Sequence, residues 1–184
     1  MGAAEDVVRL FAERGDGYHG EVVDQRRHAL QCATRAREHG ADDHLVAAAL
    51  LHDVGHLVTA AVGEPRADLS VDDDHHEAVG ARWVTPRFGP DVARAIALHV
   101  MAKRYWCTVD PAYVDTLSVT SVRTLHVQGG LLDADAVTRF AAHPGCADAL
   151  ALRAWDEAAK DPDAGTEGME TFLGVLERLA VTRV

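Results

Sequence analysis

The amino-acid sequence predicts an all-α protein in which roughly eight helices form one bundle, a single domain over residues 1–184. Apolar residues recur at the spacing of amphipathic helices, and Gly and Pro separate the periodic stretches. Aromatic residues make up only 5% of the chain, so Ala, Leu and Val must fill the interior. Ala-rich stretches such as Ala47–Ala49 suit close helix packing, and neither a hairpin turn nor a clean alternating strand stands out.

Three helices are expected in the N-terminal part of the chain. They span residues 5–14, 25–39 and about 42–54. The first ends at Gly15-Asp16-Gly17 and the second at His39-Gly40, while Asp42 or Asp43 can cap the third. The third helix carries the dyad His52-Asp53 near its C-terminal end.

Six further helices are expected after these. They span residues 75–84, 90–99, 116–127, 133–142, 146–160 and 170–182. Pro86 separates the first two, and Gly129-Gly130 and Pro144-Gly145 interrupt the later ones. The polar, acidic residues 63–74 are expected to form a mobile surface loop, and residues 101–113 to be irregular.

Composition and charge limit the classes of partner. The net charge of −11 argues against nucleic acid or an anionic membrane. Three widely spaced cysteines without a CxxC motif indicate neither a disulfide framework nor a thiolate zinc site. Glu5 and Asp6 stand where a signal peptide needs basic residues, and no apolar run approaches membrane-spanning length. A cytoplasmic location is therefore expected, with no obligatory protein partner.

Histidine is the unusual component of the sequence, with eleven residues spread from His19 to His143. His52 and Asp53 are adjacent, and on a helix their side chains point about 100° apart. Both side chains can bind the same metal only if they lie at the edge of one helix face. Otherwise the carboxylate must reach across to a second metal. Imidazole and carboxylate together are ligands of iron, manganese and zinc. The dyad alone is weak evidence, because His-Asp pairs are common by chance.

A longer pattern makes the dyad informative. Along the chain follow Gln25-x-x-His28, His52-Asp53-x-Gly55-His56, His76-Glu77-x-x-Gly80-Ala81, His99 and Asp156. From Tyr18 to Lys160, this pattern resembles the HD-domain superfamily, whose members are all-α bundles. The resemblance implies the following ligands: His28, His52, Asp53 and Asp156 for one metal, with Asp53 bridging to a second metal that His76 and His99 complete.

Two assignments within the pattern are open. His75 competes with His76 as a ligand, and the Glu-x-x-Gly-Ala sequence that follows favours His76. His56 could hydrogen-bond to a metal ligand without itself binding the metal.

Two chemistries use this scaffold. HD phosphohydrolases polarise a phosphoryl oxygen at the metals and generate hydroxide. A smaller branch, which includes inositol oxygenase and the phosphonate oxygenases, keeps a mixed-valence diiron centre and activates O2. The metal ligands are nearly the same in the hydrolases and the oxygenases. The remaining polar residues must therefore distinguish the two chemistries.

The loop before the His28 helix contains Tyr18-x-x-Glu21. It resembles an element of the phosphonate oxygenases in which the tyrosine occupies an iron position until substrate arrives. The glutamate there senses the substrate and can contact its amino end. The resemblance thus implies catalytic roles for Tyr18 and Glu21 and a substrate-binding role for Glu21. A removable ligand keeps O2 from the metal until substrate is present.

Cations and hydroxyl groups suited to a phosphonate accompany the metal ligands. Lys103 follows His99 by four residues and Arg153 precedes Asp156 by three, and such cations suit a dianion. Ser121 and Thr124 lie one helical turn apart, so both can donate to one oxyanion. The resemblance places these two hydroxyls at the phosphonate.

A C-terminal signature supports the oxygenase branch. The segments 128–130 and 152–160 resemble it, except that Ala154 stands where that branch often has another arginine.

The sequence is thus similar to the diiron phosphonate oxygenases, with two mixed-valence irons, O2 as cosubstrate and a small phosphonate as substrate. The resemblance implies C–P cleavage of a 1-hydroxyphosphonate such as (R)-2-amino-1-hydroxyethylphosphonate or its N-trimethyl analogue, and hydroxymethylphosphonate is also open. The alternative is a dinuclear HD phosphohydrolase acting on a nucleotide or small phosphomonoester. A third interpretation is a metal-dependent sensor that binds without turnover.

Overall fold

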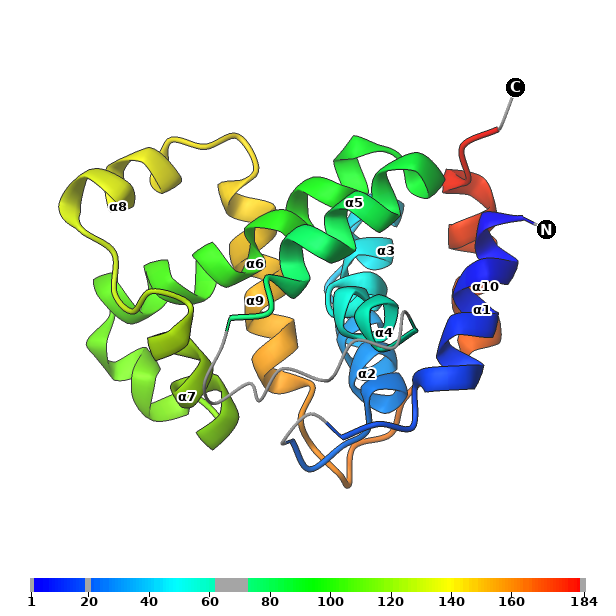
Figure 1. Cartoon of the computed structure of the whole chain (residues 1–184), viewed down its shortest axis with the longest axis horizontal. Coiled ribbons are helices and arrows are strands. Elements are labelled where there is room, and N and C mark those ends of the chain that lie inside the picture. The colour runs from blue at the N-terminus through cyan, green and yellow to red at the C-terminus, as the bar shows by residue number, and fades with distance from the viewer. Residues whose placement is uncertain (1, 19–20, 62–72, 183–184) are drawn as a thin grey trace.

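The computed structural model describes residues 2–18, 21–61 and 73–182, and these residues form helices and connecting segments without a strand. The all-α prediction is confirmed (Figure 1). The helices are α1 (Ala3–Arg14), α2 (Gln25–Glu38), α3 (Asp43–Leu51), α4 (Val54–Ala61), α5 (His76–Phe88), α6 (Pro90–Val109), the 3-10 helix η1 (Pro111–Thr116), α7 (Val119–Val127), α8 (Ala134–Ala141), α9 (Cys146–Ala158) and α10 (Met169–Leu179).

Side-chain caps fix where several of these helices begin. The carboxylates of Asp24, Asp42 and Asp133 accept hydrogen bonds from backbone N–H groups in the first turns of α2, α3 and α8. Ser118 does the same for α7. These caps satisfy backbone donors that have no partner inside the helix, so the helix starts are encoded locally.

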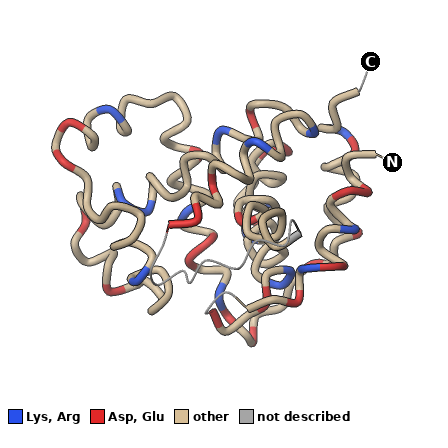
Figure 2. The backbone as a smooth tube through the Cα atoms, in the orientation of Figure 1, with Lys and Arg blue, Asp and Glu red and all other residues tan. Residues whose placement is uncertain are grey.

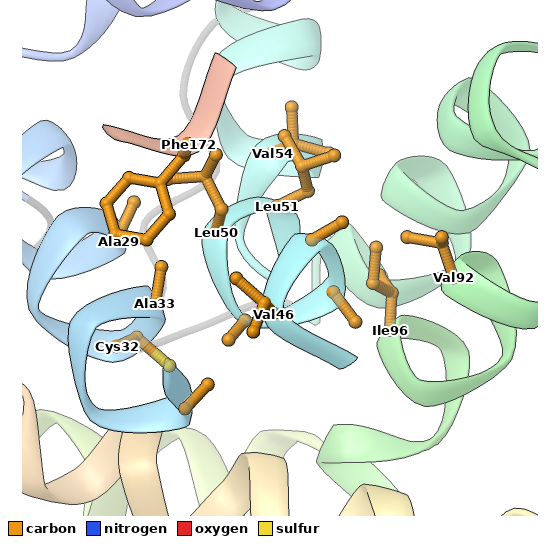
Figure 3. Close-up of a cluster of buried hydrophobic side chains, with 14 of the residues drawn as sticks. Ala29, Cys32, Ala33, Val46, Leu50, Leu51, Val54, Val92, Ile96 and Phe172 are labelled. Atoms are coloured by element: carbon orange, nitrogen blue, oxygen red, sulfur yellow. The ribbon is translucent and has the colours of Figure 1, made fainter. Parts of the chain in front are cut away.

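The main core surrounds α3, which lies between α2 and α6 (Figure 3). Leu50 and Leu51 of α3 are buried, and Phe172 reaches the same cluster from α10. The residues Ala47–Ala49 are fully buried. Their small side chains let neighbouring helix backbones approach closely, which brings polar residues of α2, of the turn after α3 and of α6 into one region.

Two of the boundaries expected around α5 and α6 are wrong. Residues 101–109 continue α6 as a regular helix, although they were expected to be irregular. The cations that suggested a loop have partners: Lys103 Nζ donates to Thr124 Oγ1, and Arg104 donates to the backbone oxygens of Gly129 and Gly130. Pro86 lies inside α5, which ends two residues later at Phe88.

The predicted third helix is divided. Helix α3 ends at Leu51, and His52-Asp53 form a turn before α4 begins at Val54. His52 keeps helical backbone angles, with φ −60° and ψ −37°. The prediction of a mobile loop at 63–74 falls largely outside the described residues.

Charged residues of both signs are interspersed along the described backbone (Figure 2). Figure 2 shows no continuous basic stripe within it, which agrees with the net charge of −11. None of the helices in the described ranges combines the length and the apolar character needed to cross a membrane.

Gly55 lets helices α4 and α5 come into close contact. A Cβ atom placed there would lie 2.0 Å from the backbone oxygen of His76. Gly80 on α5 faces the same contact, since a Cβ there would lie 3.3 Å from the backbone nitrogen of Gly55. The glycine of the HD-x-G-H sequence therefore sets the distance between His52-Asp53 and His76.

We expect Gly55→Ala to force α5 away from α4, because the obstructing atom is backbone and cannot rotate away. Overpacking of this kind costs about 1–3 kcal/mol in the free energy of unfolding, measured by urea denaturation. The control is Gly165→Ala, where no neighbouring atom lies within 4 Å of the added Cβ. A Gly55→Ala protein as stable as the control would contradict this account of the contact.

Candidate metal centre and adjoining pocket

Four histidines from different parts of the chain meet at one buried point. His28 lies in α2, His52 in the turn after α3, His76 at the start of α5 and His99 in α6. Each side chain is almost fully buried. The carboxylates of Asp53 and Asp156 lie among them. The structure therefore gathers all six residues that the sequence suggested as metal ligands.

The first group of ligand atoms surrounds His28. Its Nε2 lies 3.1 Å from His52 Nε2, 3.3 Å from Asp156 Oδ1 and 3.7 Å from Asp53 Oδ2. Two ligands that each lie about 2.1 Å from an ion are roughly 3 Å apart when their bonds form a right angle. The spacing in this group is that of atoms sharing one cation.

The second group pairs His76 with His99, whose Nε2 atoms also lie 3.1 Å apart. Asp53 Oδ1 is 3.5 Å from His76 Nε2 and 3.8 Å from His99 Nε2. The same oxygen is 3.6 Å from His52 Nε2 in the first group. Asp53 is therefore within reach of both groups, as a bridging carboxylate must be.

The hydrogen bonds of the rings show which nitrogen faces the centre. In three histidines Nδ1 donates to a backbone oxygen: His28 to Ala159, His52 to Ala49 and His99 to Ile96, at 2.9, 2.9 and 2.7 Å. A carbonyl oxygen can only accept, so Nδ1 carries the hydrogen and Nε2 presents a lone pair. Lone pairs that face each other at 3.1 Å repel unless a proton or a metal ion lies between or beside them. The donor set therefore fits two metal ions.

The fourth histidine is oriented by a carboxylate that sequence reasoning missed. Asp74 Oδ1 accepts from His76 Nδ1 at 3.1 Å, and its Oδ2 pairs with His56 Nδ1 at 2.7 Å. The His56 ring stacks on the His76 ring, with centroids 4.1 Å apart. A carboxylate behind a ligating imidazole is a common support of metal sites. Asp74 was hidden in an acidic run that was interpreted as a surface loop.

His75 lies outside this cluster. Its side chain is 70% exposed and pairs with Asp73, and its φ of 50° places it in the left-handed region. The adjacent His76 is buried against His99. The geometry thus favours His76 over His75 as the ligand.

Electrostatics keep the acidic ligands charged and one histidine neutral. Burial would raise the pKa of Asp53, but the neighbouring His52, His56 and His76 outweigh it and hold this pKa well below its usual range. The pKa of His99 is lowered to about 3, first by burial and then by His76 and His52. Burial lowers the pKa of His52 and His76, but the nearby carboxylates outweigh it and raise both pKa values. A metal ion must therefore displace protons from these two rings, because ionised carboxylate and neutral imidazole are the forms that bind metals.

A small pocket adjoins the cluster, with a volume of about 70 Å³. Its lining includes residues of α6, α7 and α9. Lys103 Nζ donates to Thr124 Oγ1 at 2.8 Å, and Arg153 Nη2 donates to Ser121 Oγ at 3.3 Å. The four residues expected to bind a phosphonate are therefore neighbours. The space holds several water molecules and is open on one side, so a small acid can enter it.

The pocket cations differ in their environments. Burial, and then the charge of Arg153, lower the pKa of Lys103 to about 7. Burial also disfavours the charge on Arg153, but Asp156, Tyr113 and Glu157 outweigh it and raise its pKa. Nearby carboxylates thus offset the burial of the charge on Lys103 less than that on Arg153. An anion bound beside the two would stabilise the charged form of Lys103 more.

Lys160 and Glu157 also belong to the pocket region, and sequence reasoning gave neither a role. Lys160 Nζ donates to Ser121 Oγ at 2.8 Å and to Glu157 Oε2 at 3.0 Å. Glu157 also accepts from Arg153. The sequence spacing could have indicated these contacts. Glu157 follows Arg153 by four residues and Lys160 follows Glu157 by three, and residues at these spacings on a helix are neighbours. Burial lowers the pKa of Lys160, but Asp156 and the other nearby carboxylates outweigh it, so the net shift is upward.

The two residues of the Tyr18-x-x-Glu21 element are placed differently. Glu21 lines the pocket and accepts from Ser118 Oγ at 2.8 Å. Tyr18 is 60% exposed and does not line the pocket, and the next two residues lie outside the described ranges. The structure does not bring Tyr18 to the ligand cluster, and its role as a removable ligand stays a prediction.

Gln128 is a further pocket residue, and its side chain has an unsatisfied hydrogen-bond acceptor. It is 8% exposed, and its Oε1 has no hydrogen-bond partner among the described residues. A buried amide oxygen without a partner is costly, so a donor group on a bound ligand would stabilise it.

We expect the purified, iron-reconstituted protein to bind about two irons per chain and His99→Ala to bind about one, because the second group loses a buried nitrogen. Elemental analysis of desalted protein measures the ratio. His126→Ala removes an exposed histidine of α7 as a control and should keep both irons. A His99→Ala protein that retains the wild-type ratio would exclude His99 as a ligand.

Comparisons with known proteins agree with this geometry. Residues 26–111 match the HD domain family. The chain is 36% identical over 176 residues to the [1-hydroxy-2-(trimethylamino)ethyl]phosphonate dioxygenase (glycine-betaine-forming) of Leisingera caerulea, a match that covers 95% of this chain and 89% of that protein. It is 40% identical over 154 residues to the hydroxymethylphosphonate dioxygenase of Gimesia maris, covering 84% and 76%. The chain therefore belongs to the HD-domain family that includes these hydroxyphosphonate dioxygenases.

Proposed function

We propose that this protein is an O2-dependent oxygenase that cleaves the C–P bond of a small 1-hydroxyphosphonate. The substrate carbon is oxidised to a carboxylate, and phosphorus leaves as phosphate, so one O2 supplies both added oxygen atoms. The observation that supports this best is the position of the pocket. Buried cations and hydroxyls adjoin a cluster with the donor set for two metals. Relatives that span most of the chain carry dioxygenase names.

The proposed cofactor is a pair of irons in the mixed-valence state. The residues that would hold it are His28, His52, Asp53, His76, His99 and Asp156. When bound, such a pair supplies redox chemistry with O2, which no side chain of this chain provides.

Binding of the phosphonate falls to the pocket residues. Lys103 and Arg153 supply positive charge, and the hydroxyls of Ser121 and Thr124 can donate once an anion reorients them. In the structure Ser121 Oγ donates to Glu157 and Thr124 Oγ1 donates to the backbone oxygen of Ser121. Substrate binding must therefore exchange these hydrogen bonds. We assign Glu21, which also lines the pocket, to the substituent on the carbinol carbon.

Tyr18 remains the proposed removable ligand. Its exposed position in the structure requires the loop to move before the phenol oxygen can reach the cluster. Such a movement would couple substrate binding to O2 access.

We expect iron-reconstituted protein to release phosphate from hydroxymethylphosphonate or [1-hydroxy-2-(trimethylamino)ethyl]phosphonate in air and to release none under argon. Phosphate release and O2 consumption should be equal in moles, because one O2 is used for each C–P bond. Lys103→Met should raise the KM at least about tenfold, since it removes a buried cation from the dianion site.

The matched control for Lys103→Met is Arg123→Met, on the same helix as Ser121 and Thr124 but not part of the pocket lining. Its KM should equal that of the wild type. Phosphate release that continues without O2, from these phosphonates or from a phosphomonoester, would replace the oxygenase proposal with hydrolysis.

A further inference from the structure

Glu21, which we assign to the substituent on the carbinol carbon, already has a cation beside it. Lys160 Nζ lies 3.2 Å from Glu21 Oε1, and Ser118 Oγ donates to the same oxygen at 2.8 Å. The side chains of Lys160 and Glu21 are only 11% and 14% exposed. Water therefore screens this ion pair weakly, and the charge on Lys160 acts at close range on any group that approaches Glu21.

Lys160 also contacts the part of the pocket that we assign to the phosphonate. The same Nζ donates to Ser121 Oγ at 2.8 Å and lies 3.9 Å from Asp156 Oδ1. Ser121 is one of the hydroxyls that we assign to the phosphonate. One ammonium group thus contacts both a hydroxyl assigned to the phosphonate and the glutamate assigned to the substituent.

This position gives Lys160 different effects on different substituents. An uncharged substituent near Glu21 leaves the ion pair intact. An ammonium or trimethylammonium group would share one carboxylate with Lys160, and two cations on one carboxylate in a poorly screened site repel each other. A cationic substrate must therefore bind against this repulsion or displace Lys160 toward Ser121 and the phosphonate.

We propose that Lys160 is a specificity-determining residue, which disfavours a cationic substituent on the carbinol carbon by competing with it for Glu21. The proposal rests on the assignment of this pocket to phosphonates. It concerns binding and does not require turnover.

Two ligands of equal shape test the proposal. These are 2-(trimethylamino)ethylphosphonate and its uncharged isostere 3,3-dimethylbutylphosphonate, which both lack the hydroxyl group at C1. Their dissociation constants are measured by calorimetry on iron-reconstituted protein under argon. The ratio of the two constants isolates the charge of the substituent, because the phosphonate contacts are common to both.

We expect Lys160→Met to shift this ratio toward the cationic ligand by at least about tenfold, because the competing charge is gone. Lys160→Gln keeps a hydrogen-bond donor without the charge and should shift it in the same direction. Lys160→Arg retains the charge and should keep the ratio within about threefold of the wild type.

Lys103→Met is the matched control, since it removes a second buried cation of the pocket that pairs with Thr124 instead of Glu21. It should weaken both ligands and leave their ratio unchanged. If Lys160→Met and Lys160→Gln behave like Lys103→Met, Lys160 is only a phosphonate ligand and the proposal is wrong.

The ratio of dissociation constants can be measured even if the protein shows no O2-dependent phosphate release. A failure of the oxygenase proposal can therefore be distinguished from a failure of the Lys160 proposal. A wild-type protein that binds neither ligand would overturn the phosphonate pocket and the role of Lys160 together.

Discussion

Each of the four clustered histidines donates its Nδ1 hydrogen to a fixed oxygen, and the position of that oxygen decides where Nε2 points. Three of the oxygens belong to the backbone, at Ala49, Ile96 and Ala159, so the helices themselves orient the rings. The consequence is two pairs of nitrogen lone pairs, each 3.1 Å apart, on either side of Asp53. A buried arrangement of this kind is stable only with positive charge at its centre. The close packing of the helices serves to maintain it.

The same constraint explains why small residues matter around the cluster. Gly55 lets the backbone of His76 approach α4, and buried alanines of α3 let α2 and α6 approach from both sides. A larger side chain at these points would separate ligands that must stay about 3 Å apart. The pocket then follows from helices that continue past the ligands. Helix α6 extends beyond His99 to place Lys103, and α9 places Arg153 one turn before Asp156.

Much of this site could be predicted because its residues are rare and widely spaced in a recognisable order. Buried His and Asp have few structural uses, so the order from His28 to Asp156 carried information beyond helix periodicity. Lys160 and Glu157 were not singled out, because charged residues near a helix end are common on surfaces. Only the three-dimensional contact with Glu21 distinguishes Lys160 from a solvated lysine. The error at residues 101–109 has a similar cause, since the partners of Lys103 and Arg104 come from distant segments.

The central claim is that Asp53 joins two metal sites. Anomalous diffraction at the iron edge from crystals of the iron-reconstituted protein tests it most directly. We predict two anomalous peaks per chain, one among His28, His52 and Asp156 and one between His76 and His99, with Asp53 in contact with both. A single peak, or a second peak away from Asp53, would contradict this account.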